Sequence, residues 1–201
     1  MPRAERRAVR TFSILTICTG NICRSPLAEQ LLRARFSEAG FTGVEIGSAG
    51  LHAVVGAPMD EIPARISSRL GGDPSRARGQ QLTSQIISAA DLVLTMTRAQ
   101  RDDLVRRHPG AVHRSFTLVE FARLLGTAGD SARRIASDMS LPSVTAERLQ
   151  SVVASAARQR PTVRLTDDDD VTDPIGRSEG VHEAVGEQIS LATSRIVFGL
   201  R

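Results

Sequence analysis

The sequence predicts an α/β fold, a four-stranded parallel sheet with helices on both faces in three α/β/α layers. Short apolar runs alternate with helix-like stretches along the chain, which is typical of β-α-β units. The first run, TFSILTI at residues 11–17, alternates too little for a half-exposed strand and so indicates one buried on both faces. The loop CTGNICRS, residues 18–25, follows directly, where such sheets bind their ligands.

The loop leads into a helix. Ser25 is expected as the N-cap and Pro26 as the first helical residue, because serine and proline favour those positions. Gly40 is expected to end this helix. Residues 41–50 then indicate a second strand, and 59–72 a helix stopped by two glycines.

The following stretches continue the alternation. Residues 84–96 predict a short helix that runs into a third strand, DLVLT at 91–95. A charged helix is expected at 97–110, ended by Pro109. The remaining elements expected are a fourth strand at 112–118, a helix at 119–126 and a last helix at 178–200.

Residues 126–166 interrupt this alternation of strands and helices. We expect an inserted segment there within one single domain, 11–201, preceded by a basic tail at 1–10. Residues 141–161 predict one helix with an apolar stripe that packs back onto the domain. The stripe comprises Leu149, Val152, Val153 and Ala156.

Composition narrows the class of protein. The 201 residues, 41% hydrophobic and 24% charged, are ordinary for a globular chain and exclude a fibrous or disordered one. The net charge of +4 suits an anionic substrate, and without a lysine-rich tail we expect no nucleic-acid partner. No stretch approaches the roughly 20 apolar residues of a membrane span.

The start of the chain and its cysteines indicate the compartment. The first apolar run is too short for a signal peptide and lacks a small-residue cleavage site, so we interpret it as a buried strand after a basic tail. Two cysteines, Cys18 and Cys23, are no disulfide framework. We therefore expect a reducing, cytoplasmic setting.

The loop at 18–25 has the residues expected of an anion-binding site. Its backbone N–H groups can point inward as a nest at the start of a helix, and Gly20 is expected to allow a positive φ there. The planar guanidinium of Arg24 suits two phosphate oxygens. The same positive field favours the thiolate of Cys18, to which Ser25 can donate a hydroxyl.

These groups predict attack of sulfur on phosphorus, giving a phosphocysteine that water then hydrolyses. Amides and Arg24 neutralise the phosphoryl oxygens, so we expect no metal and no other cofactor. Asp173, fixed by Pro174, is the candidate acid for the leaving oxygen and base for the water. Asp167, Asp168, Asp169 and Asp170 are competing carboxylates in the same acidic run.

CTGNICRSP resembles the signature loop of the low-molecular-weight protein tyrosine phosphatases, and DPIG resembles their late Asp-Pro acid loop. SAGLHAVVGAPMD, RARGQQLT, AADLVLTMTRAQ and FTLVEFARLL are similar to further family stretches. The resemblance covers about residues 11–125 and 167–198. It implies a metal-independent phosphatase of the bacterial branch.

By position, the resemblance assigns roles within the loop. It implies Cys18 as nucleophile, Arg24 as the phosphate-binding arginine, Ser25 as the thiolate-stabilising serine and Asp173 as the general acid. Asn21 would brace the loop with the support of Ser48. Cys23 matches the family's second cysteine, which forms a reversible protective disulfide, although a small buried side chain explains it equally well. The other substrate-binding positions are Thr19, Gly20 and Ile22.

The resemblance also bears on the substrate. Related arginine phosphatases usually carry Thr where Ile22 stands, so Ile22 favours phosphotyrosine. The stretch SAGLHAVVG is similar to the branch that acts on tyrosine kinases of exopolysaccharide export, which makes such a kinase the expected partner. Aliphatic Ile175, with Leu51, His52 and Val54, stands where the family usually has an aromatic wall.

Two other functions stay open at this point. An arsenate reductase would share the scaffold, but it commonly needs further cysteines and none follows Cys23. A non-catalytic phosphate-binding module is disfavoured by the complete set of Cys18, Arg24 and Asp173. A zinc half-site at the two cysteines lacks further ligands. Three histidines are expected at the surface: His108, His113 and His182.

Overall fold

The protein has the α/β fold that the sequence predicts. The computed structural model describes residues 10–127, 145–162 and 166–201. One parallel sheet runs in the order β2-β1-β3-β4. Its strands are β1 (Phe12–Cys18), β2 (Val44–Gly50), β3 (Leu92–Thr95) and β4 (Ser115–Thr117). The β1 strand lies inside the sheet with six of its seven residues buried, as its apolar run indicates.

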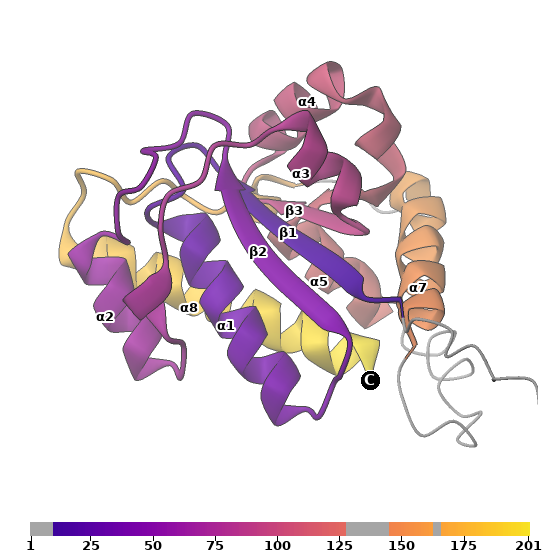
Figure 1. The fold of residues 1–201 in the computed structure, drawn as a ribbon, viewed down its shortest axis with the longest axis horizontal. Coiled ribbons are helices and arrows are strands. Elements are labelled where there is room, and N and C mark those ends of the chain that lie inside the picture. The colour runs from indigo at the N-terminus through magenta and orange to yellow at the C-terminus, as the bar shows by residue number, and fades with distance from the viewer. Residues whose placement is uncertain (1–9, 128–144, 163–165) are drawn as a thin grey trace, which may run out of the picture.

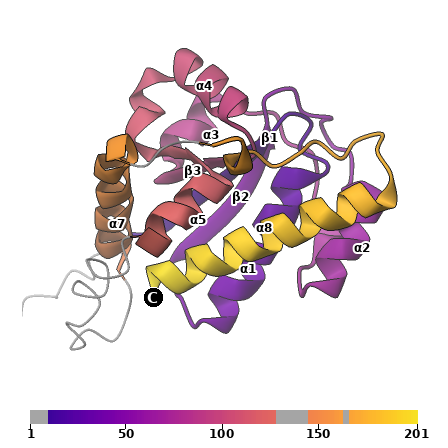
Figure 2. The same cartoon turned by 180° about the vertical axis from the view of Figure 1, so that it is seen from behind.

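Helices cover both faces of this sheet, as Figures 1 and 2 show from opposite sides. One face carries α3 (Ser84–Ala89) and α4 (Arg98–Arg107) over a smaller apolar cluster. The other face carries the larger core, beneath α1, α5 and α8 with α2 beside them. Their bounds are α1 Arg24–Glu38, α2 Glu61–Arg69, α5 Leu118–Thr127 and α8 Glu179–Leu200.

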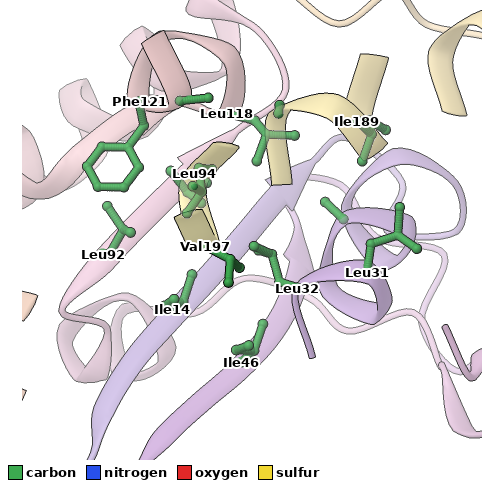
Figure 3. Packing of buried hydrophobic residues seen from close by; sticks show 14 of the residues in the cluster. Ile14, Leu31, Leu32, Ile46, Leu92, Leu94, Leu118, Phe121, Ile189 and Val197 are labelled. Atoms are coloured by element: carbon green, nitrogen blue, oxygen red, sulfur yellow. The ribbon is translucent and has the colours of Figure 1, made fainter. Parts of the chain in front are cut away.

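The larger core joins elements that are far apart in the sequence. Figure 3 shows Ile14 of β1 and Leu94 of β3 facing Leu31 and Leu32 of α1 and Val197 of α8. The sheet and α8 thereby hold α1 from two sides. Since α1 starts at Arg24, within the last residues of the loop at 18–25, this packing fixes the helix end that faces the candidate site.

The start of α1 differs from the prediction. The helix begins at Arg24, and its N-cap is Cys23, which makes no side-chain capping bond. Ser25 was expected to cap this helix, but its hydroxyl lies 3.0 Å from Cys18 Sγ instead. Gly40 follows the helix with φ +74°, as its expected stop position requires.

The later elements need two corrections. The fourth strand is shorter than predicted, because a 3₁₀ turn occupies residues 109–114. His182 was expected at the surface but is buried, since it falls three and seven residues before Val185 and Ile189 on the inner face of α8. His113 is exposed and His108 is partly buried.

The segment expected as an insertion is described in part. Residues 128–144 and 163–165 lie outside the described residues, as do residues 1–9 of the expected basic tail. Helix α7 (Ala146–Gln159) forms where a helix was expected, and its apolar stripe is buried as part of the larger core. It packs against α5 (Figure 1). Across the described ranges, no helix is long and apolar enough to cross a bilayer.

Candidate active site

The loop after β1 turns its carbonyl oxygens outward. Four of these oxygens accept backbone N–H groups from the chain at 51–60 that surrounds the loop. The donor–acceptor pairs are Leu51 with Cys18, His52 with Thr19, Val54 with Gly20 and Asp60 with Ile22, at 2.9 to 3.0 Å. None of the hydrogen bonds among the described residues uses the N–H groups of Gly20, Ile22, Cys23 or Arg24. This is the arrangement that an anion-binding nest requires.

Asn21, rather than Gly20, takes the left-handed backbone conformation. Its φ is +54°, whereas Gly20 has no positive φ, so the expectation for Gly20 is wrong. Asparagine tolerates this region because its short amide finds local partners. Asn21 Oδ1 accepts the N–H of Gln80 at 2.8 Å, and Nδ2 donates to Ser25 and Ser48 at 2.9 and 2.8 Å.

The Cys18 thiol lies at the bottom of the loop with donors around it. Its side chain is buried, and Sγ accepts the Asn21 N–H at 3.3 Å. Ser25 Oγ lies 3.0 Å from Sγ and already accepts from Asn21. The Ser25 hydrogen is therefore available to the sulfur, which stabilises a thiolate.

Sequence reasoning missed the residue that completes this chain of hydrogen bonds. Ser48 Oγ donates to Glu29 Oε2 at 2.6 Å, and Glu29 also pairs with Arg33 at 2.9 Å. Because a carboxylate only accepts, Ser48 must donate to it, which leaves the Ser48 oxygen to accept from Asn21. The position of Glu29, four residues after Ser25 on α1, was the available signal, but nothing in the sequence brings it to Ser48.

Arg24 joins the loop to the acid loop. Its side chain is buried, with Nη1 donating to the Val171 carbonyl at 3.1 Å and Nη2 to Asp173 Oδ2 at 2.6 Å. The structure thus brings together Cys18, Arg24 and Asp173, which the sequence proposed as one site. Asp173 has a side chain that is 54% exposed, so it has room to turn.

Two of the competing carboxylates, Asp169 and Asp170, have other contacts. Asp169 is buried and pairs with Arg123 of α5 at 2.8 Å. Asp170 accepts the N–H of Arg98 at 2.7 Å, at the start of α4. Asp168 is exposed. Among the described side chains of the run, Asp173 is the one that reaches Arg24.

Cys23 is buried beside the site, and both cysteines are free thiols. Burial, and after it the nearby Cys18, raises the pKa of the Cys23 thiol to about 12. Cys23 is therefore protonated near neutral pH and is a poor nucleophile there.

Three aliphatic side chains are exposed in the segments next to the loop. Val54 and Val55 of the surrounding segment are 49% and 70% exposed, and Ile175 of the acid loop is 51% exposed. His52 is also exposed, whereas Leu51 is buried. Among the described residues, no group of three His, Cys, Asp or Glu side chains is placed to hold a metal ion.

Fold and site together define a class: a cysteine phosphatase loop on a three-layer α/β/α sheet. The sequence model described as "Low molecular weight phosphotyrosine protein phosphatase" matches residues 13–130. The chain belongs to this family. The match ends close to the start of the segment 126–166, which sequence analysis set apart.

Individual relatives agree with the family. The chain is 42% identical over 108 residues to the probable low molecular weight protein-tyrosine-phosphatase EpsP of Ralstonia nicotianae, covering 54% of this chain and 71% of the relative. It is 32% identical over 151 residues to the protein-arginine-phosphatase of Geobacillus stearothermophilus, covering 75% of this chain and 97% of the relative. The crystal structure of the tyrosine phosphatase Wzb from Escherichia coli K30 in complex with sulphate superposes with a TM-score of 0.65 at 25% identity, covering 95% and 99% of the two chains.

Proposed function

We propose that this chain hydrolyses phosphotyrosine in proteins through a phosphocysteine, with Cys18 as the nucleophile and Asp173 as the acid. The observation that carries this proposal is the contact of one buried thiol with Asn21 and Ser25 inside a loop of inward N–H groups. Arg24 of the same loop donates a hydrogen bond to Asp173. Every group that the two-step displacement needs is a side chain or amide of this chain.

In the first step, Cys18 Sγ attacks phosphorus and the bond from phosphorus to the phenolic oxygen breaks. Asp173 gives its proton to that oxygen, so a neutral phenol leaves. In the second step, water attacks phosphorus, Asp173 takes a proton from it, and the P–S bond breaks. The products are inorganic phosphate and the Cys18 thiolate, which Ser25 stabilises by its hydroxyl.

Ile22 supports phosphotyrosine as the substrate. It is half-buried in the loop and offers an apolar side chain, with Val54 near Gly20 at the same side. An aliphatic wall favours a phenyl ring over a charged guanidinium group, since the latter keeps its hydration. Phosphoarginine is the second candidate, because the relative matched over 97% of its length is named a protein-arginine-phosphatase.

A phosphorylated bacterial tyrosine kinase is the partner we propose, on the resemblance of SAGLHAVVG to the exopolysaccharide-linked branch. The proposed compartment is the cytoplasm. Its reducing conditions keep thiols free, and catalysis here requires a free thiol at Cys18.

The test is hydrolysis of phosphotyrosine, phosphoarginine and phosphoserine peptides with and without reductant. We expect phosphotyrosine to give the highest kcat/KM, and Cys18→Ser to abolish turnover of p-nitrophenyl phosphate while phosphate still binds. Cys23→Ser is the matched control and should retain turnover in reductant. Wild-type turnover by Cys18→Ser would overturn the proposal. A higher kcat/KM on phosphoarginine than on phosphotyrosine would make phosphoarginine the preferred substrate.

A further inference from the structure

The acidic run before Asp173 is tied to the body of the protein at three consecutive residues. Figure 2 shows the segment that leads to α8 beginning beside α5. The sequence alone indicates no role for this run beyond that of carboxylates competing with Asp173. Its contacts reach α4, α5, α8 and the carboxyl ends of β3 and β4, so they fix where the acid loop starts.

Asp169 provides the buried end of this attachment. Its Oδ2 accepts from Arg123 and from the N–H of Thr166, both at 2.8 Å, and its carbonyl accepts the Thr117 hydroxyl at 2.8 Å. Its side chain is 1% exposed. Removal of one partner of a buried ion pair commonly unfolds a protein, so Asp169 is a poor residue for a functional test.

Asp170 provides the second attachment from a more exposed position. Its Oδ1 accepts the backbone N–H of Arg98 at 2.7 Å, in the first turn of α4 where a carboxylate is favoured. Its carbonyl accepts from Gln188 of α8 at 3.2 Å. With 33% of its side chain exposed, Asp170 can be replaced at lower cost than Asp169.

Val171 connects the attached acidic run to Arg24 in the site. Its N–H donates to the Met96 carbonyl at 2.8 Å, directly after β3, and its side chain is fully buried. Its own carbonyl then accepts Nη1 of Arg24 at 3.1 Å. Arg24 thus has a rigid backbone partner on one nitrogen and the exposed Asp173 carboxylate on the other.

We propose that Asp170 is a positioning residue for phosphate binding, which orients the Arg24 guanidinium through the Val171 carbonyl. The two partners of Arg24 behave differently when phosphate enters. Phosphate oxygens replace the exposed Asp173 carboxylate, whereas the Val171 carbonyl stays and keeps the guanidinium plane facing the loop. Bidentate binding depends on that plane, so a shift of Val171 weakens it.

This inference rests on the proposed function for the role of Arg24, and its test does not require turnover. The probe is inorganic phosphate, titrated by calorimetry into full-length Cys18→Ser protein. Asp170→Ala should raise the Kd of phosphate about 10- to 100-fold, the loss that a misplaced functional group typically causes. Asp170→Asn should recover most of the affinity, because its amide oxygen still accepts the Arg98 N–H.

Asp168→Ala is the matched control, since it removes an exposed carboxylate from the same run. It should leave the Kd unchanged, which separates orientation of Arg24 from loss of a negative charge. In the Cys18 protein, Asp170→Ala should slow alkylation of the thiol by neutral iodoacetamide by a smaller factor than it raises the Kd of phosphate. The Asn21 and Ser25 contacts of Cys18 do not involve this loop.

Gln188→Ala gives a second variant in case Asp170→Ala does not fold. It removes the other tether of the same residue, on α8, and should raise the Kd by a smaller factor. The proposal is wrong if Asp170→Ala and Gln188→Ala both bind phosphate like Asp168→Ala. It is also wrong if iodoacetamide alkylation falls in parallel with phosphate affinity, since that indicates general disruption. Weakened phosphate binding in a chain without turnover would retain this inference and overturn the proposed function.

Discussion

Arg24 and Asp173 form an ion pair with 2.6 Å between Nη2 and Oδ2. The guanidinium proposed to bind phosphate and the carboxyl group proposed as the acid are therefore in direct contact. Arg24 is buried and Asp173 is exposed, so the carboxylate is the partner that moves. Phosphate oxygens compete for the same guanidinium, which couples substrate binding to release of Asp173 toward the leaving oxygen.

Replacement of the acid should affect turnover according to the leaving group. We expect Asp173→Ala to lower kcat roughly 10²- to 10⁴-fold. The loss should be larger for phenyl phosphate than for p-nitrophenyl phosphate, whose phenolate leaves without a proton. Steady-state kinetics on both esters measures this. If Asp170→Ala shows the leaving-group dependence and Asp173→Ala does not, the acid is misassigned.

Asp173→Ala should also bind inorganic phosphate more tightly than the wild type does. Without the carboxylate, inorganic phosphate no longer displaces an ion pair from Arg24. The inhibition constant of phosphate should therefore fall below that of the wild type, with Asp168→Ala unchanged as control. A higher inhibition constant in Asp173→Ala would contradict the competition.

Loss of the Ser25 hydroxyl should weaken the thiolate. A hydrogen bond to a charged group contributes roughly 1.5–3 kcal/mol, so Ser25→Ala should lower kcat and the rate of iodoacetamide alkylation at pH 6 roughly tenfold or more. Ser151→Ala, on the exposed side of α7, is the control for the substitution itself. Unchanged alkylation would remove Ser25 from the mechanism.

Glu29 should affect catalysis by fixing the direction of the hydrogen bonds from Asn21 to Ser48 and from Ser48 to Glu29, rather than by contact with Cys18. Glu29→Gln presents an amide that can donate to Ser48, which then competes with Asn21 for the Ser48 oxygen. We expect kcat/KM to fall several-fold, corresponding to about 1 kcal/mol. Glu38→Gln, exposed on the same helix, should be neutral. Equal rates for the two variants would show that the relay ends at Ser48.

Stability at alkaline pH should report on Cys23. Its pKa is about 12 in the folded chain and about 8.5 in an unfolded one, so the folded state holds an extra proton between these values. The free energy of unfolding then falls as pH rises above about 9, by about 1.4 kcal/mol per pH unit. With no Tyr and no Lys, few other side chains titrate there. In urea unfolding, the free energy of unfolding should fall more between pH 8 and pH 10 for the wild type than for Cys23→Ala. An equal fall in both proteins would indicate that Cys23 lies in a more polar environment.

The helix of the segment 126–166 should contribute stability rather than catalysis. Leu149 is 1% exposed in the core between α7 and the domain. Leu149→Ala should cost about 2–5 kcal/mol of unfolding free energy and leave kcat/KM within twofold. A variant that keeps its stability but loses activity would assign α7 to the site.

The sequence was sufficient to predict the structure where that structure depends on residues that are close together in the chain. The first strand, the loop and the helix after it are contiguous, so hydrophobic pattern and loop chemistry predict them together. Asp173 lies 149 positions after Arg24, and the following proline was the main local sign of its role. The structure brings the two side chains together, although no pattern in the sequence gives their distance.

Local preferences failed where a contact elsewhere in the site competes for the same side chain. Ser25 is a good N-cap by type, but its hydroxyl is taken by Cys18 and Asn21. Glycine is the residue that adopts a left-handed conformation most readily, yet Asn21 does so here because Gln80, Ser25 and Ser48 satisfy its amide. The contacts of Ser25 with Cys18 and of Asn21 with Ser48 were expected, whereas the contact with Gln80 forms only once the sheet is assembled and was not predicted.

Among the described residues, the hydrogen bonds from the segment at 51–60 to the loop at 18–25 come from main-chain N–H groups. Exposed positions in it, such as His52 and Val55, can therefore change while that scaffold is preserved. Evolution can vary the rim that meets a protein substrate independently of the reacting centre. One catalytic core of this kind can then serve many different targets.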